Sequence, residues 1–324
     1  MKKKILVTGG SGFIGTNLVE FYRENFEVIN IDILPPRNKN HNIYWKKVDI
    51  LDEESLLIFF SIFKPDFVLH MAARTDLDGQ SLEDYAANIK GVENIVNVIN
   101  KIESVNKIIF ASSRLVCEIG YNPKDELDYK PSTVYGESKI LGEKIVRASK
   151  IKNTDWLIVR PTSLWGPWFG IPYKSFFDII ERKLYFHPKG KKIHKKFGFV
   201  LNSVHVLDVL LKVDKLNKKT VYLSDFEELE VKTWADTISS HYHGKKVKEI
   251  PYFILKIFSI VGDLLLRIGM KNPPLTSFRL KNLTTQMYYN TEDVENVVRT
   301  LPFTIEEGTN ITFEWLKRRE CIKI

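Results

Sequence analysis

The segment ILVTGGSGFIG at residues 5–15 is the most informative part of this chain, because a glycine-rich turn there joins an apolar run to a candidate helix. Gly9, Gly12 and Gly15 are spaced three residues apart. Glycines at such a turn let the backbone bend tightly and approach a ligand closely. The following helix would offer free N–H groups and the positive end of its dipole to a pyrophosphate. The segment therefore predicts a dinucleotide-binding loop.

An acidic residue stands where such a loop needs one. The next β-rich run, EVINID, ends at Asp32, which lies 20 residues after Gly12. A carboxylate there can accept hydrogen bonds from an adenosine ribose and would repel a 2′-phosphate. We therefore expect a nicotinamide dinucleotide, with NAD preferred over NADP. The nearby Arg37 is the one residue that argues for NADP.

Short β-rich runs alternate with longer amphipathic runs over the first 160 residues. Strands are expected at 4–8, 27–32, 42–48, 66–70, 107–112 and 156–160, and helices near 13–24, 53–63, 82–102 and 133–150. This alternation is typical of βαβ units and predicts an α/β fold with a doubly wound parallel sheet. After residue 170 the alternation is lost. We expect an NAD-binding domain over 1–170, to which 200–225 returns, and a smaller mixed α/β substrate lobe over 171–324.

Composition and charge limit the function further. The chain of 324 residues is 44% hydrophobic and 27% charged, and its two cysteines are too few for a disulfide framework or a cysteine metal site. We expect no metal and a reducing, cytoplasmic location. The net charge is +8, and residues 181–196 contribute +6 of it. This local positive field suits an anionic ligand such as a diphosphate better than a nucleic acid. A solvated loop is the alternative.

One segment, IPYFILKIFSIVGDLLLRIG at 250–269, is apolar enough to suggest a membrane. However, Lys256, Asp263 and Arg267 interrupt it, so no window of about 18 residues is free of charge. We expect a buried or lid helix of the second lobe rather than an integral membrane segment. Peripheral membrane contact is the alternative.

A hydroxyl, a phenol and an ammonium are expected at one edge of the sheet. Ser112 and Ser113 follow the run KIIFA, and ligands of this architecture bind at the carboxyl ends of the strands. Tyr135 and Lys139 are four residues apart and would share one face of a helix. The ammonium would favour the phenolate of Tyr135, whose ordinary pKa is about 10. Tyr135 could then take a proton from a substrate alcohol.

Taken in order, the motifs resemble those of the extended short-chain dehydrogenase/reductase family, and within it the NAD-dependent nucleotide-sugar epimerase/dehydratase branch. The resemblance covers nearly the whole chain and is more specific for the family than for the substrate. The matching segments are TGGSGFIG (8–15), VDI (48–50), HMAA (70–73), NIKGVENI (88–95), ASS (111–113), YGESK (135–139), RPTSLWGP (160–167), VHVLDV (204–209) and TIEEGTNITFEWL (304–316). It implies a Rossmann-type domain and a nucleotide-diphosphate sugar substrate, and we also expect a homodimer.

The resemblance also implies roles for single residues. Tyr135 would transfer the proton, Lys139 would bind the nicotinamide ribose and lower the tyrosine pKa, and Ser113 would bond the reacting oxygen. The other cofactor contacts would come from Gly9, Ser11, Gly12, Phe13, Ile14 and Gly15 at the pyrophosphate, Asp32 at the ribose, Asp49 and Ile50 at adenine, and Met71, Ala72, Ala73, Pro161 and Ser163 around the nicotinamide. Asn88, also counted among the cofactor-site residues, would support the catalytic residues. Substrate contacts are expected from Arg74, Ser113, Arg114, Ser163, Lys191, Lys192, Lys195, Lys196 and Arg279.

Three departures from the family pattern concern the substrate side. Cys117 stands where a tyrosine is usual, and Ser163 stands where an asparagine is common. The segment VLNSVHVLDV lacks the arginine often found before its valine–aspartate pair, which is why the cations of the second lobe are candidates for the diphosphate. In addition, Arg114 and Leu115 follow Ser113, in place of the Asp–Glu pair of 4,6-dehydratases.

The leading hypothesis is therefore a nucleotide-sugar epimerase, acting at C4 of a hexose through transient oxidation to a keto-sugar. One alternative is an NAD(P)-dependent dehydrogenase or reductase of a nucleotide ketosugar or a hydroxysteroid-like alcohol. The other is a non-catalytic dinucleotide-sensing protein, which would have no need of the serine, tyrosine and lysine.

Overall fold

The computed structural model describes residues 2–170, 173–270 and 273–321, and the chain divides into two compact units. Unit 1 comprises Met1–Thr162, Val200–Ser224 and Asn290–Pro302, and unit 2 comprises Ser163–Phe199, Asp225–Tyr289 and Phe303–Ile324. Unit 1 thus ends its first stretch at Thr162 rather than at residue 170. It also includes 290–302, which the sequence analysis assigned to the second lobe.

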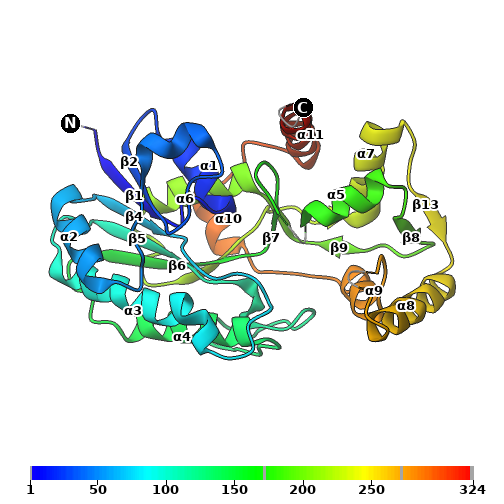
Figure 1. Ribbon diagram of the computed structural model, residues 1–324, viewed down its shortest axis with the longest axis horizontal. Helices are drawn as coiled ribbons and strands as arrows, with labels where there is room; N and C mark the ends of the chain where they lie inside the picture. The colour runs from blue at the N-terminus through cyan, green and yellow to red at the C-terminus, as the bar shows by residue number, and fades with distance from the viewer. Residues whose placement is uncertain (1, 171–172, 271–272, 322–324) are drawn as a thin grey trace. The chain divides into compact units, whose positions relative to one another are not determined.

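A seven-stranded sheet forms the centre of unit 1 (Figure 1). The strands pair in the order β11–β6–β5–β4–β1–β2–β3, and every pair is parallel. Their bounds are β1 (Lys4–Thr8), β2 (Glu27–Ile31), β3 (Trp45–Lys46), β4 (Phe67–His70), β5 (Lys107–Ala111), β6 (Asp155–Pro161) and β11 (Thr220–Leu223). The order reverses at β1 and β4, which is the switch point where ligands bind in doubly wound sheets. The predicted fold class is confirmed.

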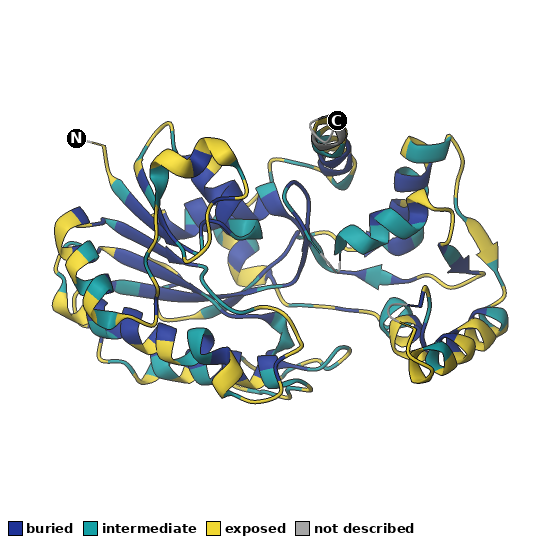
Figure 2. Cartoon of the chain, in the orientation of Figure 1, coloured by how far each residue is buried: buried dark blue, intermediate teal, exposed yellow. Residues whose placement is uncertain are grey.

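Helices cover both faces of this sheet (Figure 1). One face carries α1 (Phe13–Tyr22), α6 (Val200–Lys212) and α10 (Glu292–Val298), and the other carries α2 (Glu53–Phe63), α3 (Ala86–Lys101) and α4 (Val134–Ala148). The strands between them are almost wholly buried (Figure 2). Burial on both faces explains why a run such as IIFA in β5 has no polar alternation.

The strand expected at 42–48 is mostly absent, so that prediction is wrong. Lys39–Tyr44 form a 3₁₀ helix instead, and only Trp45–Lys46 pair with β2. Asn38 caps the 3₁₀ helix through its side chain, and the buried His41 bonds the Glu20 carboxylate at 2.6 Å. Such local polar contacts compete with strand pairing.

Unit 2 combines short strand pairs with helices. The pairs are β7 (Ser163–Trp165) with β10 (Phe197–Phe199), β9 (His194–Lys195) with β12 (Leu229–Glu230), and β8 (Phe186–Pro188) with β13 (Lys248–Ile250). The helices are α5 (Tyr173–Glu181), α7 (Val231–His243), α8 (Tyr252–Arg267), α9 (Ser277–Thr284) and α11 (Ile305–Cys321). Aromatic rings fill its interior, and the Trp165 ring lies 5.0 Å from those of Phe199 and Trp234.

Most of the apolar segment at 250–269 forms helix α8, which is not a buried helix; the other expectation, a lid helix, stays a prediction. Phe253, Ile257 and Leu264 are each more than half exposed. Within the described ranges, no helix combines the length and the apolar character needed to cross a bilayer.

Candidate active site

The glycine-rich turn leaves no room for side chains at two positions. Gly9 has φ of +72°, and its N–H donates to the Ile31 carbonyl at 2.9 Å. A Cβ added to Gly9 would lie 2.6 Å from the backbone of Ala72, and one added to Gly15 would lie 2.2 Å from the Gly9 carbonyl oxygen. The turn is therefore packed between the residues that follow β4 and the first turn of α1.

The start of α1 fits a pyrophosphate. Gly12 is its N-cap, and among the described residues no side chain caps this end and no acid lies in the first turn. The first N–H groups of a helix have no partner within the helix, and they carry the positive end of its dipole. Phe13, Ile14 and Gly15 supply this turn, as the sequence predicted.

Asp32 follows β2 and contacts the same turn. Its carboxylate accepts the N–H of Ser11 at 3.1 Å and that of Leu34 at 2.9 Å. Burial raises the pKa of Asp32, and these N–H groups act in the opposite direction. A carboxylate has about four acceptor positions, so Asp32 can still accept hydrogen bonds from a ribose.

The other predicted cofactor residues of unit 1 follow neighbouring strands. Met71 and Ala72 come after β4 and donate their N–H groups to Thr8, at 3.0 and 3.2 Å. Asp49 accepts the N–H of Leu51 at 2.9 Å. The side chain of Ile50 is 6% exposed and belongs to the core, so only its backbone is available to an adenine. Ala73 continues the segment after Ala72, and Pro161 ends β6.

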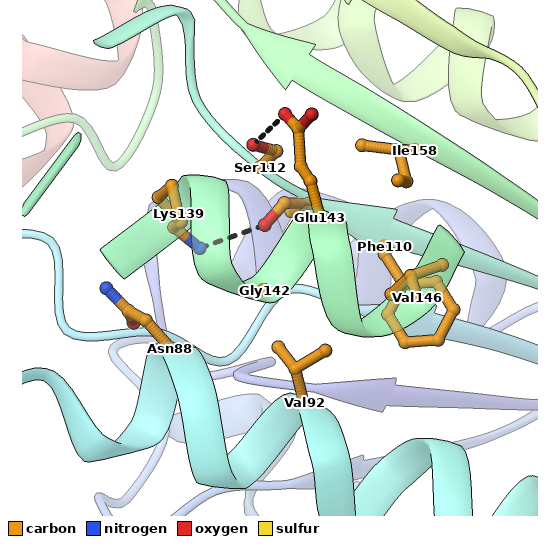
Figure 3. Close-up of a pocket in the computed structure, with 10 residues that line it drawn as sticks. Asn88, Val92, Phe110, Ser112, Lys139, Gly142, Glu143, Val146 and Ile158 are labelled. Atoms are coloured by element: carbon orange, nitrogen blue, oxygen red, sulfur yellow. Dashed lines mark hydrogen bonds between the residues drawn. The ribbon is translucent and has the colours of Figure 1, made fainter. Parts of the chain in front are cut away.

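Lys139 is buried at the carboxyl end of β5. Its Nζ donates to the Ala111 carbonyl at 2.9 Å (Figure 3). Burial lowers the pKa of Lys139 to about 8, and the charge of Glu143 acts in the opposite direction. A cavity of about 10 Å³, lined in part by Asn88, Ser112, Lys139 and Glu143, lies here. That volume is the lower limit for one water, so the cavity is part of the packing around Lys139 rather than a substrate pocket.

His70 ends β4 and is buried beside Thr8. Its Nδ1 lies 2.7 Å from the Thr8 hydroxyl. Burial, together with the charge of Lys139, lowers the pKa of His70 to about 3. The imidazole is therefore neutral, and the positive charge at this edge of the sheet is that of Lys139.

The first turn of α4, which carries Tyr135, packs against the segment after Ser113 at a glycine that the sequence analysis did not single out. Tyr135 is in the first turn of α4 and is 6% exposed. A Cβ on the adjacent Gly136 would lie 2.3 Å from the Leu115 carbonyl oxygen. Leu115 belongs to the 3₁₀ helix Arg114–Val116, which Ser113 caps by accepting the Leu115 N–H at 3.1 Å. The structure thus brings the predicted serine, tyrosine and lysine to one edge of the sheet.

A buried ion pair below this edge was missed by the sequence analysis. Glu143 and Arg160 have side chains that are each 1% exposed, and two guanidinium N–H groups donate to the carboxylate at 2.8 Å. The carboxylate also accepts the hydroxyl of Ser112 at 2.5 Å (Figure 3), and it accepts that of Tyr129 at 2.8 Å. A signal did exist: Glu143 follows Lys139 by four residues, and Arg160 is the lone charge of the predicted strand 156–160.

Asn88 holds the segment after β4 against α4. Its side chain bonds the N–H and the carbonyl of Arg74, at 2.9 and 3.0 Å, and donates to the Ser138 hydroxyl at 2.9 Å. The guanidinium of Arg74 is paired with Asp76 at 2.9 Å, so it would have to leave this partner to reach a substrate. Arg114 is half-buried beside Ser113.

The remaining predicted residues belong to unit 2 and do not form a single surface. Ser163 is buried in β7 and accepts the hydroxyl of Tyr173 at 2.9 Å. Lys195 is 4% exposed, and its Nζ donates to a carbonyl of α9 at 2.6 Å. Arg279 donates to the Pro273 carbonyl at 2.6 Å. Lys191 and Lys192 are exposed, and Lys196 is half-buried.

Comparisons with known proteins agree with this geometry. The model of the NAD dependent epimerase/dehydratase family matches residues 5–184. N-acetyl-alpha-D-glucosaminyl-diphospho-ditrans,octacis-undecaprenol 4-epimerase of Escherichia coli O157:H7 is 24% identical, over 97% of this chain and 96% of the relative. The decarboxylating sterol-4-alpha-carboxylate 3-dehydrogenase of Mus musculus is 25% identical, over 96% and 90%. Among solved structures, UDP-glucose 4-epimerase of Thermotoga maritima with UDP-glucose gives a TM-score of 0.72 at 19% identity, covering 98% of this chain and 99% of that one.

Proposed function

We propose a function from one premise: the chain belongs to the NAD-dependent epimerase/dehydratase family, as its motifs predicted. It acts as an NAD-dependent nucleotide-sugar epimerase that inverts C4 of a nucleotide-linked hexose. The observation that carries the proposal is the placement of Ser113, Tyr135 and Lys139 at the edge of the sheet where a pyrophosphate-binding turn also lies.

NAD bound at this edge supplies an acceptor that takes a hydride from a substrate carbon and can return it. The residues that would hold it are the first turn of α1 at the diphosphate, Asp32 at the adenosine ribose, and Lys139 at the nicotinamide ribose. Met71–Ala73 and Pro161 follow strands that end at the same edge and would border the nicotinamide.

The chain itself supplies the acid–base chemistry. The Oη of Tyr135 takes the proton of the C4 hydroxyl when this carbon is oxidised and gives it back when the carbonyl is reduced. The ammonium of Lys139 favours the phenolate. The Oγ of Ser113 donates a hydrogen bond to the reacting oxygen. For inversion, the keto-sugar would have to present its opposite face before a hydride returns to C4 and the proton returns to the oxygen.

The residues after Ser113 favour inversion over dehydration. A 4,6-dehydratase must remove a proton from C5 and protonate a leaving hydroxyl at C6. Arg114 stays protonated in proteins and Leu115 has no proton to exchange, so neither can serve as that base or acid. Epimerisation needs no further acid–base group.

A second candidate substrate is a sugar diphosphate carried on a lipid alcohol. The Escherichia coli relative is named for such a substrate, a diphospho-undecaprenol sugar, and the mouse relative is named for a sterol. On this chain, the exposed apolar side of α8 favours a lipid-linked substrate. A dehydrogenase acting on such an alcohol is the competing reaction.

A panel of sugar donors tests the proposal. The protein is incubated with NAD and with UDP-, GDP- and CDP-hexoses or a polyprenyl diphosphate sugar, and the sugar is followed by NMR. We expect inversion at C4 without accumulation of reduced cofactor, measured by its near-ultraviolet absorbance. Reduced cofactor formed in proportion to product, with no inverted sugar, would instead establish a dehydrogenase.

Cofactor choice should depend on Asp32. NAD should bind much more tightly than NADP, because the carboxylate repels a 2′-phosphate. Asp32→Ala should therefore narrow the difference between the two affinities. Asp32→Asn is the matched control, since it removes the charge but keeps an oxygen for the Leu34 N–H. Titration of the cofactor-free protein with both dinucleotides measures the effect. Equal affinities in the unmutated protein would remove Asp32 from this role.

The activity should depend on pH through Lys139. Its pKa of about 8 means that the ammonium is present below this pH and is lost above it. Consequently kcat/KM, which reports the free enzyme, should fall as the pH rises through about 8. Lys139→Arg keeps its charge throughout and should abolish this decline, whereas Lys139→Met should be slow at every pH. If kcat/KM of Lys139→Arg declined with pH in the same way, the decline would belong to another titrating group.

A further inference from the structure

On the side that packs against the protein, helix α8 of unit 2 has one bulky residue, Leu255, and two small ones, Ser259 and Gly262. These three are its buried positions. A Cβ on Gly262 would lie 1.7 Å from the Leu275 carbonyl oxygen, so the backbone of α8 rests directly on the segment before α9. Most of the other bulky residues of α8 therefore lie on the opposite side of the helix.

These bulky residues form an exposed apolar face. With 3.6 residues per turn, they share one arc about 100° wide, opposite the buried positions. Its residues are Phe253, Ile257, Ile260, Val261, Leu264 and Ile268, which are exposed by 63%, 54%, 57%, 49%, 58% and 72%. Figure 2 shows most of α8 in yellow, the colour of exposed residues. The surfaces of soluble proteins carry isolated apolar residues, whereas here five adjoin on α8 and a sixth, Ile268, follows at its C-cap.

Cations border this face. Lys256 and Arg267 lie at one edge of the arc, as the helical spacing places them. Asp263, the only acidic residue of α8, accepts the N–H of Ser277 at 3.0 Å and so holds α9 in place. The apolar face thus has positive charge along one edge, where the only nearby acid of the helix also bonds the N–H of Ser277.

The basic segment 189–196 joins the start of the same helix. Strand β8 pairs with β13, and the N–H of Lys189 donates to the Ile250 carbonyl at 2.9 Å. The Nζ of Lys191 lies 4.2 Å from the ring centre of Tyr252, the first residue of α8. The basic segment 189–196 therefore lies beside the start of α8, the helix with the exposed apolar face.

Unit 2 carries the entire net charge of the chain. It contains 21 Lys and Arg residues against 13 Asp and Glu, a net of +8, whereas unit 1 contains 27 of each. Such a field attracts an anionic surface. It also opposes pairing of α8 with α8 of a second copy, because that would bring two units of charge +8 together.

We propose that α8 docks this protein on an anionic lipid bilayer. The apolar face enters the boundary between headgroups and acyl chains, and Lys256, Arg267 and Lys191 meet the lipid phosphates. A strongly apolar face with a basic border is the pattern of helices that lie in the bilayer surface. At 16 residues α8 lies on the membrane rather than across it. The inference is independent of the sugar that the active site takes.

Vesicle co-sedimentation of the full chain, without substrate or cofactor, tests this. We expect binding to vesicles of phosphatidylcholine with phosphatidylglycerol, weaker binding to phosphatidylcholine alone, and a decrease with salt. Ile257→Gln with Leu264→Gln should lower the partition coefficient about tenfold or more. Both side chains are exposed, so the fold should be retained, which thermal unfolding verifies.

The matched control is Ile58→Gln with Ile62→Gln on α2, where two residues exposed by 55% and 77% are changed in the same way outside the proposed face. It should bind like the unmutated protein. Lys256→Gln with Arg267→Gln should weaken the preference for phosphatidylglycerol. The proposal is overturned if the protein binds to neither kind of vesicle. It is equally overturned if the α8 and α2 double variants bind to vesicles to the same extent. It is also overturned if the α8 variant loses only self-association, measured by sedimentation velocity.

Discussion

Tyr135→Phe should lower turnover by a factor on the order of 10² or more, while NAD remains bound. The substitution deletes the phenolic oxygen that carries the proton and leaves the ring. The ring is 6% exposed and lies 5.9 Å from that of Tyr85, so its packing should be unchanged. Turnover of the sugar found in the donor panel, a titration with NAD and a thermal unfolding curve separate loss of chemistry from loss of binding or fold.

Tyr85→Phe is the matched control. Tyr85 is fully buried next to Tyr135, and its hydroxyl donates to the Asp76 carbonyl at 2.9 Å. Its loss should lower stability but preserve most of the turnover, because this hydroxyl has no place in the proposed proton transfer. If Tyr135→Phe turned over like the Tyr85→Phe protein, the mechanism would be wrong.

The parts of the site that the sequence predicted depend on short-range rules. The turn at Gly9–Gly15 and the strand ending at Asp32 are specified by local spacing, and parallel strands bring their carboxyl ends to one edge. Tyr135 and Lys139 share a helical face because they are four residues apart. Each of these inferences needs only the type of the element and its direction in the sheet.

The features that the sequence did not predict depend on what packs against an element. The apolar pattern of α8 suits a buried helix equally well, and its exposure follows from Ser259 and Gly262, which let the helix lie directly on the backbone near Leu275. Likewise, Glu143 and Arg160 lie on α4 and β6, and neither element alone reveals that both charges are buried together.

Removing one partner of this pair should be the most destabilising change in unit 1. Arg160→Met leaves the Glu143 carboxylate buried with only hydroxyl donors, and breaking a buried pair in this way costs about 3–5 kcal/mol. Lys90→Met is the control, because its ion pair with Glu93 is exposed and such pairs contribute about 0–1 kcal/mol. Urea unfolding measures both. A loss in Arg160→Met as small as that in the control would mean that water reaches the pair.

The double variant Glu143→Gln with Arg160→Met should recover part of that stability, because it no longer buries an unpaired charge. Glu143→Gln also has a readout at the active site. The charge of Glu143 raises the pKa of Lys139 against the effect of burial, so its removal should lower this pKa further. The decline of kcat/KM should then move to a pH below about 8, in a direction that a purely structural loss would not produce. A decline at the same pH in the folded Glu143→Gln protein would show that the ion pair supports the fold without tuning the ammonium beside Tyr135.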